Sequence, residues 1–140
     1  MYQTSTITDT KVPLDLSGTS TINYIFYNAK QLKTIRDIIF PTAGTASSAF
    51  TGCTALENIT VSGSTQISLV FTSCTNLNKA SIESIINSLS STTSGLTLTL
   101  SKAAVNTAFG IDVDDVSTYP EGSEYYNLRH SKPDWNVSYA

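Results

Sequence analysis

Few side chains in this 140-residue sequence could carry out acid–base or nucleophilic chemistry, and their spacing does not bring them together. The one histidine, His130, stands between Arg129 and Ser131 near the end of the chain. A Ser-His-Asp triad would have to use this imidazole, yet no Gly-x-Ser-x-Gly turn presents a serine for it. A histidine at the end of a helix interacts favourably with the helix dipole. We therefore interpret His130 as a helix-terminal residue and expect no enzymatic activity.

The acidic residues gather in one stretch, where a cation site is the chemistry to consider. They are Asp112, Asp114, Asp115, Glu121 and Glu124. A calcium ion takes about six to eight oxygen ligands, and the EF-hand loop supplies them from alternate positions around a glycine. The stretch lacks that pattern, so we interpret it as a solvated loop. We expect neither a metal site nor a cofactor.

Two cysteines, Cys53 and Cys74, are separated by 21 residues and occupy equivalent positions of a repeated pattern. Neighbouring parallel segments lie about 4.8 Å apart, so a disulfide between these cysteines is geometrically conceivable. Free cysteine behaves as a small buried hydrophobe, and the sequence favours two reduced, stacked thiols over a bridge. Two thiols and one distant imidazole cannot complete the tetrahedral shell of zinc.

Composition and charge argue against two classes of partner. The net charge is −3, charged residues make up only 14%, and no run of Lys or Arg occurs. Binding to nucleic acid rests on neutralising phosphates, so we expect no nucleic-acid partner. The longest apolar runs are far shorter than the ~20 residues of a membrane helix, and residues 1–6 lack the pattern of a signal peptide. We therefore expect no membrane insertion. Ser and Thr supply 41 residues, which suits an extracellular or virion protein.

Three segments share a pattern in which Phe is followed by Leu six residues later and by a small or branched apolar residue nine residues later. A period of 20 to 25 residues, roughly, is typical of stacked repeats, in which each unit buries its apolar edge against its neighbours. We expect equivalent residues to form ladders: Phe26, Phe50 and Phe71; Leu32, Leu56 and Leu77; Ile35 and Ile59; Cys53 and Cys74.

The elements that would position these residues follow from apolar periodicity. Short strands are predicted at the amino-terminal edge, at the close of each repeat and near the C-terminus: 12–16, 32–38, 56–61, 77–81, 96–100 and 135–139. Helices are predicted where the period changes to that of an α-helix or where a cap residue stands: from Ser81 through Leu89, from Ala103 to Phe109 before Gly110, and from Ser123 to about Ser131.

The repeat resembles a known family. The segment Ala49-Phe-Thr-Gly-Cys-Thr-Ala-Leu-Glu-Asn-Ile-Thr-Val61 is similar to the repeat unit of BspA-like (Treponema pallidum-type) leucine-rich repeats, whose pattern is A-F-x-x-C-x-x-L-x-x-I followed by an apolar residue. Residues 70–77 repeat it, and residues 25–32 are a weaker copy. The sequence departs from the pattern by an insertion near Pro41 and by Ala80 in place of the third Ile. Residues 81–100 and the Trp135 segment resemble the cap that follows such repeats in proteins of gut bacteria and their phages.

This resemblance implies an α+β fold: one domain over 1–140, with an amino-terminal cap (1–21), a short leucine-rich-repeat solenoid (22–82) and a C-terminal cap of helices and strands (83–140). It also implies non-catalytic binding or adhesion at a bacterial cell surface, by contact with a protein or glycan of a host or bacterial surface. The alternative is a structural or receptor-binding component of a phage tail, located in the virion.

Strand residues between the ladder positions point to the opposite face of the strand. This alternation nominates a shallow surface of hydroxyl, amide and charged groups, composed of Thr34, Arg36, Asn58, Thr60 and Lys79. A solvated sheet face without a ligand is the alternative interpretation of these residues.

Overall fold

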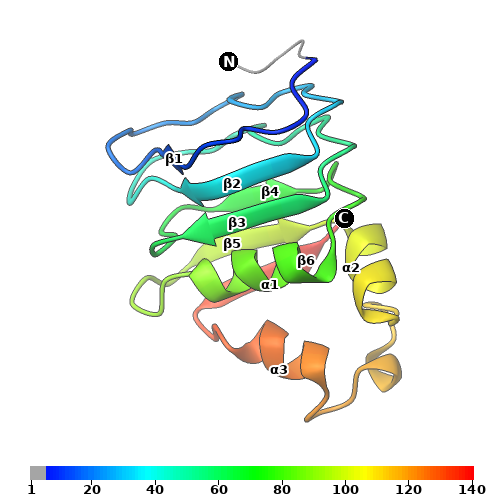
Figure 1. The fold of residues 1–140 in the computed structure, drawn as a ribbon. Helices are drawn as coiled ribbons and strands as arrows, with labels where there is room; N and C mark the ends of the chain where they lie inside the picture. Colours follow the sequence, from blue (N-terminus) through cyan, green and yellow to red (C-terminus); the bar gives the residue numbers. More distant parts are fainter. Residues whose placement is uncertain (1–5) are drawn as a thin grey trace.

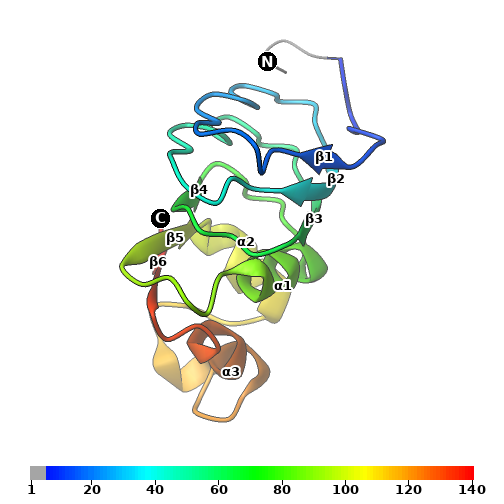
Figure 2. The same cartoon turned by 90° about the vertical axis from the view of Figure 1, so that its left-hand side faces the viewer.

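The computed structural model describes residues 6–140. Its strands form two three-stranded parallel sheets (Figure 1). The first sheet has the order β1-β2-β3 and the second the order β4-β5-β6. Their bounds are β1 (Leu14–Asp15), β2 (Thr34–Ile39), β3 (Asn58–Ser62), β4 (Leu69–Phe71), β5 (Leu96–Leu100) and β6 (Trp135–Tyr139). Figure 2 shows the first sheet on one side of the molecule and the second on the other. The buried residues of both sheets belong to one hydrophobic cluster.

The expectation of a leucine-rich-repeat solenoid closed by helix and strand caps is wrong. Within the described residues, the chain forms an α+β fold with these two sheets and three α-helices. The third repeat does not close with the strand predicted at 77–81, because helix α1 (Lys79–Ser88) begins there. Asn78, and not Ser81, is the cap: the Asn78 side chain accepts a hydrogen bond from the Ser81 backbone N–H. Residues 1–5 lie outside the described residues. They include part of the predicted amino-terminal cap (1–21) and most of the segment 1–6 that was considered as a signal peptide.

Helix α1 covers the edge of β3 and satisfies its backbone. The Ser81 hydroxyl accepts a hydrogen bond from Ile59 N–H at 2.9 Å and donates one to the Glu57 carbonyl, also at 2.9 Å. One helical turn further, the Ser84 hydroxyl accepts a hydrogen bond from Val61 N–H at 2.9 Å. An edge strand normally presents a row of unpaired backbone groups, and here two serines of a helix take the place of a neighbouring strand.

The remaining predicted elements are confirmed by the structure. Helix α2 (Lys102–Phe109) begins after the cap Ser101 and ends at Gly110, whose φ of 65° is the left-handed conformation that glycine favours. A short 3-10 helix, η1 (Val116–Thr118), leads to helix α3 (Glu124–His130), which begins after the cap Ser123. Strands β5 and β6 lie where the alternating pattern predicts them.

Stacked phenylalanine rings line the core. The ring centroids of Phe26 and Phe50 are 5.6 Å apart and those of Phe50 and Phe71 are 4.4 Å apart, with interplanar angles of 23° and 26°. Phe40 meets Phe50 edge-on at 6.1 Å. Such aromatic pairs contribute about 0.5–1.5 kcal/mol beyond their burial. The leucines six residues later, Leu32, Leu56 and Leu77, are buried as well.

The outer edge of the first sheet is closed by short side chains of its own segment. Asp9 accepts a hydrogen bond from Lys11 N–H at 2.7 Å, and Asp15 accepts one from Ser17 N–H at 2.9 Å. Both acceptors precede their donor by two residues, the geometry of an Asx turn. The backbone N–H groups of Lys11 and Ser17, which flank β1, are therefore satisfied locally.

Candidate functional site

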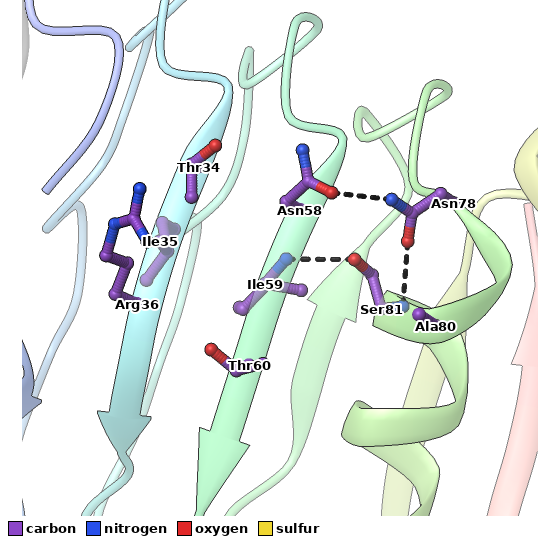
Figure 3. A pocket seen from close by; sticks show the side chains of 9 residues that line it. All are labelled: Thr34, Ile35, Arg36, Asn58, Ile59, Thr60, Asn78, Ala80 and Ser81. Atoms are coloured by element: carbon purple, nitrogen blue, oxygen red, sulfur yellow. Dashed lines mark hydrogen bonds between the residues drawn. The ribbon is translucent and has the colours of Figure 1, made fainter. Parts of the chain in front are cut away.

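A shallow hollow of about 370 Å³ lies over β2, β3 and the start of α1 (Figure 3). It brings together four of the five residues that the strand alternation nominates, Thr34, Arg36, Asn58 and Thr60. The lining is completed by two strand residues and three residues around the helix start: Ile35, Ile59, Asn78, Ala80 and Ser81. The hollow is therefore polar at its rim and is built on regular secondary structure.

The register of β2 and β3 sets the spacing of the rim. Thr34 is the partner of Asn58, and Ile35 is the partner of Ile59. Ile35 and Ile59 are buried. The residues before and after each of them in its strand therefore face outward. Figure 3 shows the Thr34 and Asn58 side chains next to each other at the same level of the two strands. The predicted alternation of core and surface positions holds for these residues.

A β-bulge displaces the next residues of β2. The register moves from Ile35 opposite Ile59 to Ile38 opposite Val61, so two residues of β2 oppose one of β3. The extra residue is Asp37, whose φ of 44° lies in the left-handed region that Asp tolerates better than most residues. Its backbone N–H donates to the Thr60 hydroxyl at 3.0 Å, so a lining residue of the hollow stabilises the bulge.

Arg36 is the one charged residue of the lining, and Asp9 holds its guanidinium in place. Nε lies 3.0 Å from Asp9 Oδ1, and Nη2 lies 2.7 Å from Asp9 Oδ2. The hydrogen bond from Arg36 lowers the pKa of Asp9 and raises the pKa of Arg36. Because the Arg36 side chain is 54% exposed, solvent screens the pair, and its value lies in orientation more than in stability.

The amide side of the hollow is ordered by hydrogen bonds. Asn78 Nδ2 donates to Asn58 Oδ1 at 2.6 Å, and Asn78 Oδ1 caps α1, as Figure 3 shows. The Ser81 hydroxyl is engaged as both donor and acceptor with the strand backbone. Three groups at the rim form no hydrogen bond with any residue in the described part of the chain: Asn58 Nδ2, Arg36 Nη1 and the Thr34 hydroxyl. These groups are available to a ligand.

Lys79, the fifth nominated residue, lies apart from the hollow. Its Nζ is 2.6 Å from the Glu124 carboxylate and 5.5 Å from the centroid of the Phe109 ring. The hydrogen bond with Glu124 raises the pKa of Lys79. The nomination assumed a strand over 77–81, and in the observed helix the side chain reaches α3 instead. Three lining residues that the sequence did not nominate, Asn78, Ala80 and Ser81, come from this helix start.

Several other residues considered for chemistry have structural partners. His130 ends α3, and its Nδ1 is 2.8 Å from the Tyr126 carbonyl. In the acidic stretch, Asp114 pairs with Lys102 at 2.6 Å. No group of three potential ligands among His, Cys, Asp and Glu within residues 6–140 is arranged to hold a metal ion.

The cysteines are free and buried. Cys53 Sγ donates to the Phe26 carbonyl at 3.0 Å, and burial raises the pKa of this thiol to about 11. Burial also raises the pKa of the Cys74 thiol, and the nearby Cys53 thiol raises it further. A reactive cysteine needs a lowered pKa, so both thiols are packing residues.

None of the helices between residues 6 and 140 combines the length and the apolar character that crossing a membrane requires. Comparison of the chain with protein-family models, with curated proteins and with solved structures finds no match. The similarity of residues 22–82 to BspA-like repeats therefore stays a prediction.

Proposed function

We propose that this chain is a non-catalytic binding module that contacts a protein or a glycan through the hollow over β2, β3 and α1. The observation that carries the proposal is the convergence of Thr34, Arg36 and Asn58, each with a polar group that has no partner in the described residues. A few well-placed polar groups on a rigid scaffold are the usual basis of specific recognition.

The chemistry of the rim favours a ligand rich in hydrogen-bond acceptors. The amide of Asn58, the free Nη1 of Arg36 and the hydroxyl of Thr34 all can donate. Carbonyl groups of a peptide and hydroxyl or acetamido oxygens of a glycan accept such bonds. Because Arg36 and Asn58 are held by Asp9 and Asn78, little side-chain entropy is lost when the ligand binds.

The hollow lacks the arrangement that catalysis needs. Three hydroxyl groups line it, those of Thr34, Thr60 and Ser81. The Ser81 hydroxyl already bonds to the β3 backbone in both directions, and the Thr60 hydroxyl accepts a hydrogen bond from Asp37 N–H. A base within hydrogen-bond reach is required to activate such a group, and the lining contains neither a carboxylate nor an imidazole. These features support binding over reaction. The hydroxyl-rich, weakly charged composition supports a location at a bacterial cell surface.

An array of glycans and surface proteins tests the proposal, followed by titration of any ligand found. Thr34→Arg places a long side chain across the hollow, and Asn58→Ala removes one donor. We expect Thr34→Arg to weaken binding by at least about tenfold, which corresponds to ~1.4 kcal/mol. The matched control is Thr107→Arg, because Thr107 is exposed on α2 and its replacement changes the net charge equally. Equal binding by Thr34→Arg and the parent chain would refute the proposed surface.

A further inference from the structure

A second hollow, of about 190 Å³, lies between the end of α3 and the start of β6, two elements joined by a short loop in Figure 1. Three basic side chains line it: Arg129, His130 and Lys132. The amide residue Asn136 and the buried residues Trp135 and Val137 contribute the rest of its walls, with Pro133. Two of the basic side chains, Arg129 and Lys132, carry positive charge in a chain whose net charge is −3.

The basic side chains at this hollow differ from the paired cations elsewhere in the described part of the chain. Arg36, Lys79 and Lys102 each form an ion pair with a carboxylate. Arg129 and Lys132 form none with any carboxylate of residues 6–140. No acidic residue lines the hollow, although Asp134 is next to it in sequence.

Arg129 is held with part of its guanidinium available. Nη1 donates to the Tyr119 hydroxyl at 2.9 Å, and the guanidinium carbon lies 5.3 Å from the centroid of the Tyr139 ring. Nε and Nη2 form no hydrogen bond with a described residue. Two adjacent N–H groups of arginine match the two oxygens of a carboxylate or phosphate.

Compensation of the helix dipole explains only part of this arrangement. Arg129 and His130 lie in the last turn of α3, where positive charge is favourable. Lys132 follows the C-cap Ser131, and its Nζ lies 3.4 Å from the Ser91 hydroxyl, a long contact. Lys132 therefore adds a positive charge beyond the last turn of the helix.

We propose that this hollow binds a small oxyanion, either a carboxylate or a phosphate group. Arg129 would supply two parallel hydrogen bonds, and Lys132 would add a second charge. The buried indole of Trp135, fixed by its hydrogen bond to the Ser90 carbonyl at 2.9 Å, gives the hollow a rigid apolar wall. The site is separate from the hollow over β2 and β3, and neither proposal depends on the other.

NMR titration tests this inference. The amide and arginine side-chain signals are followed while inorganic phosphate is added at constant ionic strength, and in a separate titration while acetate is added. We expect saturable shifts confined to residues 128–137 with at least one anion, and the two titrations show which oxyanion is preferred. Lys132→Gln should raise the dissociation constant at least about threefold, the upper part of the range for an exposed charge. The matched control Lys30→Gln, which removes an exposed lysine of the first repeat, should leave it unchanged.

Arg129→Lys provides a second variant, because it keeps the charge and loses the paired N–H groups. We expect it to bind more weakly than the parent chain while its thermal unfolding remains cooperative. Shifts that do not saturate, or an equal loss of binding in Lys30→Gln and Lys132→Gln, would overturn the proposal. So would a chloride titration that reproduces the same shifts, because it would show general screening of charge.

Discussion

Replacement of Ser81 by Ala tests the role of α1 as the partner of β3. Ser81 is 2% exposed, and its hydroxyl is the acceptor for Ile59 N–H. Without the hydroxyl this buried donor has no partner, which costs about 1–3 kcal/mol. The Glu57 carbonyl keeps its bond from Asn78 N–H at 3.0 Å, and alanine favours the helix by about 0.5 kcal/mol over serine. The free energy of unfolding should therefore fall by about 1–2 kcal/mol.

Chemical denaturation measures this loss directly, and thermal unfolding should show a melting temperature lowered by about 3–6 °C for a domain of this size. Hydrogen exchange adds a local measurement, because the Ile59 amide should exchange faster relative to its neighbours in the variant. Ser62→Ala is the matched control: Ser62 is exposed at the end of β3, and its replacement should change stability by less than about 0.5 kcal/mol. If Ser81→Ala matches the control in stability and leaves exchange at Ile59 unchanged, then the helix does not support the strand.

Three further predictions concern the core and the turns. Phe50→Ala should lower the free energy of unfolding by about 3–5 kcal/mol in urea denaturation, because this ring contacts three other phenylalanines; a loss below about 1 kcal/mol would contradict the stacking. Burial raises the pKa of Cys53 to about 11, so between about pH 8.5 and 11 the unfolded chain releases this thiol proton while the folded chain retains it. The free energy of unfolding should therefore fall as the pH rises through this range. Denaturation of Cys53→Ala at each pH checks this, because the fall should be smaller in that variant. Gly44→Ala should destabilise the fold strongly in a thermal melt, because a Cβ there would lie 1.7 Å from the Ser20 carbonyl oxygen at a φ of 113°; Gly18→Ala, with open space around it, is the control and should melt like the parent.

The sequence predicted the elements whose signals are local. The alternation of Leu96, Leu98 and Leu100 and the caps Ser101 and Ser123 place strand and helices correctly, because each signal lies within the element it defines. The same holds for the two helix ends that Gly110 and His130 mark. Periodicity and capping are properties of a single segment, so no knowledge of tertiary contacts is needed to use them.

The division into two sheets could not be predicted in this way. Residues 77–81 continue the repeat in sequence, yet Asn78 caps a helix that the apolar spacing of Ile82 and Ile85 then extends. Strand β4 is three residues long, and it exists because Leu69 and Phe71 pair with Leu98 and Leu100 of β5. Such pairing between distant segments leaves no local pattern to detect.

The candidate site shows the same limit. Thr34, Arg36, Asn58 and Thr60 were found because alternation in β2 and β3 defines an outer face. The helical wall was missed, and Lys79 was nominated wrongly for the hollow, because both depend on where α1 begins. The sequence signal that could have corrected this is Asn78, three residues before Ser81 at the position where a cap side chain meets a backbone donor.

The outer edge of the first sheet has a consequence for how the molecule behaves at high concentration. The N–H groups that an incoming chain would need for cross-strand pairing at Lys11 and Ser17 are already occupied by Asp9 and Asp15. The Asp15 carboxylate also places a negative charge at this edge, whereas that of Asp9 is paired with Arg36. Growth of fibres by addition of strands is thereby disfavoured at this end, even though the sheet is parallel and rich in hydroxyl residues.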